Sequence, residues 1–506
     1  MPAPRAPRPA SPGPLAPCLL ALAALLAACG ATSVDDGDVD RNPRLVDGVS
    51  IRDIAVFQAV KVPIVQNGTP VVDRAVPLLV SRGGMMRVYV DLAGDWVGRE
   101  LTAELVLASQ ATEPVVLTDV RTLAGPSSDS DPASVFAFPL ADADMAGDTA
   151  YQVRITAPDA ARVPEGQVHP ARYPSDGTSA GFAPLFDDAG GLNLVLVPVR
   201  YDTDSSGRLP DMSTEQLARY DGILRTMYPL VTVNLTIHDP IPYNYPAGWA
   251  GFDFGALNDD LMDLRESENA PDDAYYFGLV MPDDTFDHYC GGGCVLGQSF
   301  LVSRVGDAFL RVGGGVGFPG EESAVTLAHE VGHQHGREHA PCDVPDPDPD
   351  YPYSNGSIGV WGYDLRANAF KDPATSKDYM SYCERVWTSD YTYIGIFDRV
   401  LAVNALPKSR VHGPAMLHAA LTLGVAADGT LTPRRTVRLR DLPHTGRRPA
   451  RLLRADGSLL RTIEAALAPH GHGGTGTLFI AEPPADAVFL EVTTWDTSAL
   501  RRVRLR

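Results

Sequence analysis

The residues best suited to chemistry are three histidines and a glutamate in the spacing H-E-x-x-H-x-x-G-x-x-H, namely His329, Glu330, His333, Gly336 and His339. On a helix, His329 and His333 leave the same face and can bind one metal ion. Glycine at 336 can take the left-handed conformation that ends a helix, so the chain can turn back and present His339 as a third ligand. Three neutral imidazoles leave one tetrahedral position open, which is the arrangement of a catalytic zinc site.

A second motif follows at residues 377–383, with the sequence KDYMSYC. Together the two motifs resemble the metzincin metallopeptidases, in which a methionine turn lies beneath the zinc. The resemblance implies that Met380 shapes the site from below. It also implies that Tyr382 lies beside the metal, where its hydroxyl stabilises the oxyanion or binds zinc in the resting enzyme. Ala340 follows the third histidine where several subfamilies carry an acidic or polar residue, so the subfamily stays open.

The chemistry predicted from these motifs is zinc-dependent hydrolysis of peptide bonds in extracellular proteins or glycoproteins. Glu330 would take a proton from the attacking water and pass it to the leaving amine. The alternative is a catalytically inert surface binding or adhesion lipoprotein with a relic zinc site, against which the retained Glu330 counts. His335, on a different face of the helix, is predicted to be a bystander, as are His288 and the histidines after residue 413.

The N-terminus predicts export. A positive start precedes a short apolar run, Leu19 to Ala28, which is too short for a permanent anchor and is typical of a signal peptide. The ending Leu-Ala-Ala-Cys resembles a bacterial lipobox, with Cys29 as the lipidated residue; a plain signal peptide with an incidental cysteine is the alternative. Residues 1–28 are then the signal and 29–48 a flexible tether. Gly30 favours the outer membrane, on its periplasmic or outer face.

This setting and the β-rich flanking regions are similar to secreted bacterial metzincins such as the mucin-cleaving ToxR-regulated lipoprotein family. The formal net charge of −21 argues against nucleic acid and anionic membranes as partners. Membrane attachment would therefore come from the lipid, and we expect a monomer.

Four cysteines remain after Cys29, namely Cys290, Cys294, Cys342 and Cys383. An even number in an oxidising compartment predicts two disulfides, for which three pairings exist. We favour Cys290–Cys294 and Cys342–Cys383, the second of which would pin both halves of the zinc site. A structural zinc site is the alternative, although no C-x-x-C spacing is present.

The segment 343–353 alternates proline and aspartate and cannot be helical. Its carboxylates could bind calcium, but the spacing is not that of an EF-hand, so a solvated acidic loop is the favoured interpretation.

The fold class predicted from pattern and resemblance is an α+β multidomain protein. Its zincin or metzincin catalytic domain, residues 186–412, would be a mixed twisted sheet with an active-site helix. An N-terminal β-sandwich (49–185) and a small C-terminal β-domain (413–506) would flank it, because short alternating runs dominate both regions. Between the strand DAYYFGLVMP and the zinc helix lie Cys290 to Cys294 and the run GDAFLRVGGGVGFPGEE, part of which should form the rim of the cleft, where an extended edge could pair with a substrate backbone. Arginines concentrate in the last domain, for which a solvated face is the favoured interpretation and a basic surface that docks acidic partners is the alternative.

Overall fold

The computed structural model describes residues 42–110, 113–245, 252–406, 417–495 and 499–505. The predicted signal peptide, Cys29 and the boundary between 412 and 413 lie outside the described residues. The chain divides into two compact units. Of the described residues, the first unit comprises those within 42–56, 62–74 and 80–186, and the second comprises those within 57–61, 75–79 and 187–505.

The first unit is built from antiparallel strands. One sheet has the order β5-β4-β7-β8, with β9 also paired to β7, and β1, β2, β3 and β6 belong to another. Alternate residues of β7 are buried, as a strand with one face on the core requires. The bounds are β1 (Val49–Gln66), β2 (Thr69–Pro70), β3 (Gly84–Leu92), β4 (Arg99–Ala108), β5 (Val115–Leu123), β6 (Phe136–Leu140), β7 (Ala150–Thr156), β8 (Arg172–Tyr173) and β9 (Gly181–Phe182), with short 3₁₀ turns at Pro132–Ser134 and Asp142–Asp144.

The second unit holds a sheet of order β11-β10-β13-β15-β14, with β12 also paired to β10. Strands β10, β11, β12, β13 and β15 run parallel, and β14 runs antiparallel to β15 at the edge. Every residue of β13 and β15 is buried, as expected for central strands covered on both faces. The bounds are β10 (Leu192–Tyr201), β11 (Val233–Ile237), β12 (Ile241–Tyr243), β13 (Ala274–Val280), β14 (Gly297–Ser299) and β15 (Val312–Val316).

Helices of 14 or 15 residues accompany this sheet, and their starts follow local rules. The side chain of Ser213 caps α2, and Ser389 caps α6 in the same way. The helices are α2 (Thr214–Met227), α3 (Phe254–Ser267), α4 (Phe286–Cys290), α5 (Glu321–Gln334) and α6 (Asp390–Asn404), with 3₁₀ turns at Ala308–Leu310 and Ser354–Gly356 and short strands β16 (Gly362–Asp364), β17 (Ala369–Lys371), β18 (Lys377–Asp378) and β19 (Val386–Trp387).

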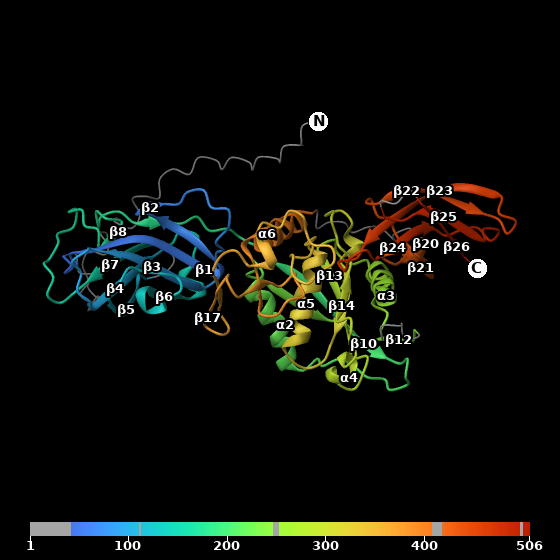
Figure 1. Cartoon of the computed structure of the whole chain (residues 1–506), viewed down its shortest axis with the longest axis horizontal. Coiled ribbons are helices and arrows are strands. Elements are labelled where there is room, and N and C mark those ends of the chain that lie inside the picture. The colour runs from blue at the N-terminus through green and yellow to red at the C-terminus, as the bar shows by residue number, and fades with distance from the viewer. Residues whose placement is uncertain (1–41, 111–112, 246–251, 407–416, 496–498, 506) are drawn as a thin grey trace, which may run out of the picture. The chain divides into compact units, whose positions relative to one another are not determined.

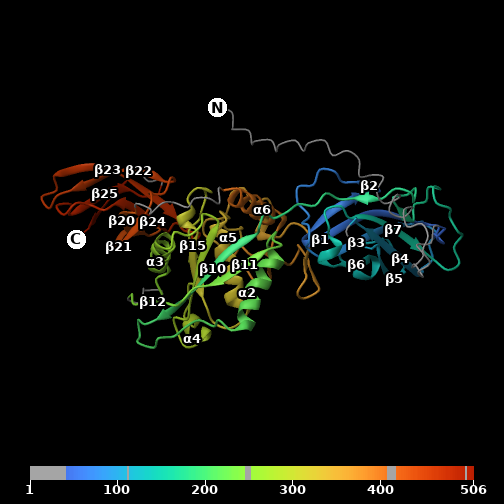
Figure 2. The same cartoon turned by 180° about the vertical axis from the view of Figure 1, so that it is seen from behind.

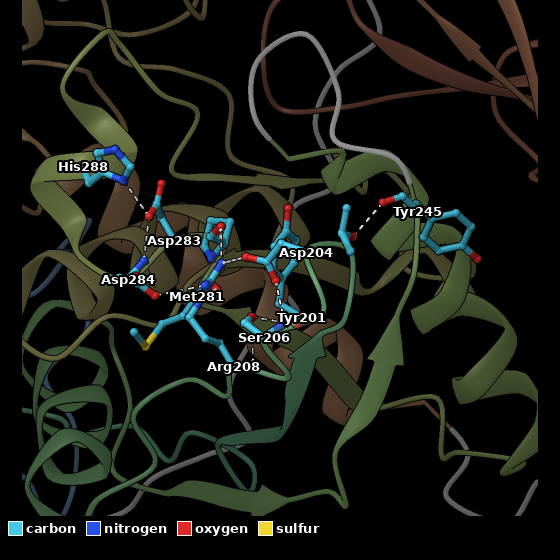
Figure 3. Close-up of polar contacts among 11 residues, drawn as sticks. Tyr201, Asp204, Ser206, Arg208, Tyr245, Met281, Asp283, Asp284 and His288 are labelled. Atoms are coloured by element: carbon cyan, nitrogen blue, oxygen red, sulfur yellow. Dashed lines mark hydrogen bonds and ion pairs between the residues drawn. The ribbon is translucent and has the colours of Figure 1, made fainter.

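The loops that leave the carboxyl ends of β10 and β13 are joined by one arginine. The Arg208 guanidinium donates to Asp204 Oδ2 at 2.5 Å and to Asp284 Oδ1 at 3.0 Å, and Nε donates to the Met281 carbonyl (Figure 3). His288 lies in the same cluster, exposed and hydrogen-bonded to Asp283. The cations and carboxylates of this cluster pair with one another, so it stabilises the rim of the sheet.

The C-terminal strands form one antiparallel sheet of order β21-β20-β24-β23-β22-β25-β26. Its face packs on α3, and the two share a hydrophobic core in which Leu257 and Leu261 meet Val437 and Phe479. Figure 1 and Figure 2 both show α3 beside β21. The bounds are β20 (His418–Val425), β21 (Leu431–Leu439), β22 (Arg447–Leu453), β23 (Leu459–Pro469), β24 (Gly476–Ala481), β25 (Phe489–Thr493) and β26 (Leu500–Arg504).

Ion pairs reinforce this packing. Arg435 of β21 contacts Asp260 and Asp263 of α3, and Arg440 contacts Glu266. Arg434 lies against the N-terminus of α3, 3.7 Å from Asp253. These arginines were expected on a solvated face, and that prediction is wrong for Arg434 and Arg435, because the carboxylates of α3 approach them from a distant part of the chain.

The predicted α+β class is also wrong. Strands account for 38% of the residues that the structure describes and helices for 17%, and most of these strands belong to curled sheets of the sandwich type. The structure therefore does not show the expected architecture. That architecture was a metzincin catalytic domain, with a mixed twisted sheet and an active-site helix, between two separate β-domains. The physical reason is that alternating apolar runs fill both ends of the chain, while its longer helices span only 14 or 15 residues each. Among the described residues, no helix is long and apolar enough to cross a membrane.

Candidate active site

Helix α5 carries the first two histidines, and both of its ends are fixed. The side-chain amide of Gln216, on α2, donates to the Gly320 carbonyl at 3.0 Å and accepts from the Gly320 amide at 2.8 Å. Glu321 and Glu322 occupy the first turn, where negative charge favours the helix dipole. At the other end Gly336 adopts φ of +80°, as the sequence predicted, and the chain turns back toward His339.

The three histidines converge. His329 Nε2 lies 3.2 Å from His333 Nε2 and 3.3 Å from His339 Nε2. His329 Nδ1 donates to the Tyr379 carbonyl and His333 Nδ1 to the Arg337 carbonyl, both at 2.7 Å. Because Nδ1 carries the proton in these two rings, their Nε2 lone pairs face one another across the site.

The three rings are also electrically neutral. All are buried, and burial is the main reason that the pKa of each lies below its ordinary value. For His339, burial and the neighbouring His329 and His472 lower the pKa to about 2. Neutral imidazole is the form that binds a metal, so no proton has to leave these rings before a metal is bound.

This donor set fits a metal ion. Lone pairs that converge with no hydrogen between them repel one another unless a cation lies among them. Nitrogen ligands held about 2.0–2.1 Å from a tetrahedral zinc are separated by about 3.3–3.4 Å, close to the distances found here. Two other groups of potential ligands occur among the described residues, Glu330–His333–His472 and Cys342–Asp343–Cys383, but the cysteines of the second are joined in a disulfide.

The turn that contains Met380 supports the site from below. Met380 is fully buried, and a side chain at Gly332 would place its Cβ 2.4 Å from Met380 Sδ, so only glycine allows this close approach to α5. Asp378 holds the turn, because Oδ1 accepts from the Met380 amide and Oδ2 from the Ser389 amide. The turn thereby supplies the Tyr379 carbonyl that orients His329.

Both favoured disulfides are present. Cys342 and Cys383 have Cα atoms 5.8 Å apart, and Cys290 and Cys294 have Cα atoms 4.8 Å apart. Backbone hydrogen bonds accompany the first: the Ala340 amide donates to the Met380 carbonyl at 3.0 Å, and the Tyr382 amide donates to the Cys342 carbonyl at 3.1 Å. The segment after His339 and the methionine turn are therefore held together both covalently and by hydrogen bonds.

Glu330 is buried beside the histidines, and its two oxygens have different surroundings. Oε1 accepts from His472 Nε2 at 2.9 Å, whereas Oε2 has no hydrogen-bond partner within the described part of the chain. Tyr382 is half-exposed, its ring centroid 4.8 Å from that of His339, and its hydroxyl lies 2.5 Å from His472 Nδ1. Burial, followed by the negative charge of Glu330, raises the pKa of Tyr382, so the phenol stays protonated at neutral pH.

Three of the histidines predicted to be bystanders, His335, His288 and His472, have different surroundings. His335 is a core residue, stacked on Tyr275 with ring centroids 4.6 Å apart, and burial lowers its pKa to about 3. His288 lies on the rim described above. His472, however, reaches the site from the turn between β23 and β24, so the prediction is wrong for this residue. Burial alone lowers the pKa of His472, but the charge and hydrogen bond of Glu330 outweigh that effect and raise it.

The edge strand expected to bind a substrate backbone is already paired at one end. The Gly471 amide donates to the Ser299 carbonyl at 2.9 Å, and the Leu301 amide donates to the Pro469 carbonyl at 3.0 Å. The turn between β23 and β24 thus lies along the end of β14 and pairs with it at Ser299 and Leu301, so this end of the edge is not free, and substrate pairing along the rest stays a prediction. The only hint in the sequence that this turn has a special role is the run HGHGG, in which a histidine lies between glycines inside an apolar hairpin.

The acidic segment after Cys342 lies beside His339. The Asp348 amide donates to the His339 carbonyl at 2.7 Å, and the Asp348 side chain accepts from the Tyr391 hydroxyl and lies 3.6 Å from Arg337. The Asp348 carboxylate is therefore used in packing. Calcium binding by the other carboxylates of this segment stays a prediction.

One comparison bears on this site. Residues 306–390 match the family described as Peptidase M66, and this range contains α5, the three histidines and the methionine turn. No curated protein matches the chain. The match supports a peptidase of a metallopeptidase family, and the histidine cluster is consistent with a bound metal.

Proposed function

We propose that the protein is a zinc-dependent endopeptidase that uses the metzincin set of catalytic residues. The observation that carries the proposal is the convergence of three neutral imidazoles at 3.2 and 3.3 Å, with a buried carboxylate next to them. A structural zinc site needs a fourth protein ligand and no base, whereas a catalytic site has three ligands and a base nearby. His329, His333 and His339 would hold the ion.

When bound, zinc supplies Lewis-acid chemistry, polarising a carbonyl and making water more acidic. Glu330 supplies the base. Its Oε2 is buried, unpaired within the described residues and therefore available to accept a proton from water, while Oε1 is held by His472. The same oxygen can return that proton to the leaving amine.

Tyr382 would stabilise negative charge on the reacting carbonyl oxygen. Its raised pKa keeps the hydroxyl protonated, and its half-exposed ring lies where a substrate can reach it. The single O–H lies against His472 in the substrate-free protein and would turn from that nitrogen to donate to the carbonyl oxygen. Met380 has no direct chemical part, because its thioether is buried against Gly332. Its packing holds in place the Tyr379 carbonyl, which accepts a hydrogen bond from His329.

We extend the proposal to location and substrate. The signal-like N-terminus and Cys29 support export with a lipid anchor in the outer membrane, and two disulfides suit an oxidising compartment. An anchored enzyme of this kind would act on extracellular proteins or glycoproteins. The cleavage-site profile of the purified protein on a broad peptide pool would define the preference.

The experiment that tests the activity is a comparison of Glu330→Gln with the wild type, each with its zinc content measured. The variant should keep one zinc and lose turnover by at least about 10²-fold, because the base contributes about 10²–10⁴-fold. His339→Ala should lose zinc on dialysis as well as activity. Full proteolysis by Glu330→Gln would refute the base assignment, and a wild type that binds zinc but cleaves nothing in the pool would favour the relic, adhesion-type alternative.

A further inference from the structure

His472 reaches the site from the C-terminal sheet, 142 residues along the chain from Glu330. It lies outside the segment that matches the peptidase family. Its ring is largely buried, and both ring nitrogens are engaged. Nδ1 lies 2.5 Å from the Tyr382 hydroxyl, and Nε2 donates to Glu330 Oε1 at 2.9 Å. In the neutral ring, the tautomer with the proton on Nε2 satisfies both contacts, with Nδ1 accepting from the hydroxyl. In the protonated ring, which the charge of Glu330 favours, Nδ1 donates to the hydroxyl oxygen instead.

The turn that carries His472 is held firmly in place. β23 and β24 are central strands of the seven-stranded sheet, whose core is continuous with that of α3 and β15. The Gly471 amide is bonded to Ser299, and a Cβ at Gly471 would meet the His333 ring at 2.1 Å. A Cβ at Gly473 would meet Asp346 Oδ2 at 2.8 Å. The turn therefore lies against Ser299, His333 and Asp346.

We infer that His472 is a positioning residue for peptide hydrolysis, which fixes Glu330 in its working orientation and holds Tyr382 beside the site in the substrate-free protein. This inference rests on the proposed function. Holding Oε1 leaves Oε2 as the oxygen that accepts the proton, and restricts rotation of the carboxylate. Holding the tyrosine hydroxyl keeps the phenol beside His339. The C-terminal sheet is then part of the peptidase rather than an attached binding module.

The kinetic test compares His472→Ala, His472→Gln and His472→Asn in the full-length, zinc-loaded protein. His472→Ala should keep its zinc and lower kcat by about 10–100-fold, with KM changed less than about threefold. His472→Gln should recover most of that loss, because its amide N–H can occupy the position of Nε2 and donate to Glu330. His472→Asn should recover less, because its amide reaches only the position of Nδ1.

The matched control is His418→Gln, which makes the same chemical change at an exposed position of β20 in the same sheet. It should leave kcat unchanged. Three results would overturn the inference: a wild-type kcat in His472→Ala, a kcat that rises because the turn had blocked the groove, or a loss of zinc.

A second measurement separates this inference from the proposed function, because it needs neither zinc nor turnover. In metal-free protein with ¹⁵N-labelled histidine, at a pH high enough for the His472 ring to be neutral, His472 should show the tautomer protonated at Nε2. Glu330→Gln should shift Nε2 and Tyr382→Phe should shift Nδ1. If the Nδ1-protonated tautomer is found, or neither variant moves these signals, the positioning role is wrong even if the protein is a peptidase. If the signals respond as expected but no peptide is cleaved, the contacts stand and the proposed function fails.

Discussion

Removal of the disulfide Cys342–Cys383 should affect the zinc site, whereas removal of Cys290–Cys294 should not. The first closes a loop with a sequence separation of 41 residues and the second one with a separation of 4. From loop-closure entropy, these disulfides stabilise the folded state by about 4 and about 2 kcal/mol at 25 °C. The double variants Cys342→Ser/Cys383→Ser and Cys290→Ser/Cys294→Ser avoid unpaired thiols.

Removal of the Cys342–Cys383 disulfide should also weaken zinc binding, for a structural reason. Cys342 and Cys383 join the segment that presents His339 to the turn that presents the Tyr379 carbonyl, to which His329 is hydrogen-bonded. Without the covalent link, only the Ala340–Met380 and Tyr382–Cys342 backbone bonds hold the two together.

The first assay is chemical unfolding of the metal-free protein. The transition to follow is the one that shifts when zinc is added. The second assay measures zinc affinity by competition with a chelating dye. We expect the first variant to lose about twice the free energy of the second and to be the one with weaker zinc binding. Equal losses, or unchanged zinc affinity in Cys342→Ser/Cys383→Ser, would refute the reasoning.

Other perturbations test separate features. Burial raises the pKa of Asp259 to about 6 from an ordinary 3.8. Between these two pH values the folded state keeps a proton that the unfolded state has released. The free energy of unfolding therefore falls as the pH rises from about 4 to about 6. Asp259→Asn should therefore stabilise the protein by about 1–3 kcal/mol at pH 7.5 and hardly at all at pH 3.5 in urea unfolding; equal effects at both pH values would contradict this. Gly332→Ala should cost about 1–3 kcal/mol and weaken zinc binding, because its Cβ meets Met380, whereas Gly292→Ala, with open space around it, should do neither. Chelation should lower the melting temperature, by an amount equivalent to about 4 kcal/mol when zinc had been present at a thousand times its Kd, and His339→Ala should abolish that shift.

Much of the site could be predicted from the sequence because its geometry is local. Two histidines four residues apart on a helix must share a face, and glycine at 336 is the residue that tolerates the observed φ of +80°. The disulfide pairings agree with the favoured choice, although the sequence left three open.

What only the tertiary structure decided depends on contacts between distant segments. No spacing rule connects His472 to Glu330, because the hydrogen bond exists only after the C-terminal sheet packs its core on α3. The same packing covers one end of the β14 edge and pairs Arg435 with Asp260. The strand-dominated fold class was missed because the family motifs occupy a short segment, whereas fold class is set by the sheets along the whole chain. Sequence therefore determined which residues can bind a metal, and tertiary packing determined which distant residue reaches the base.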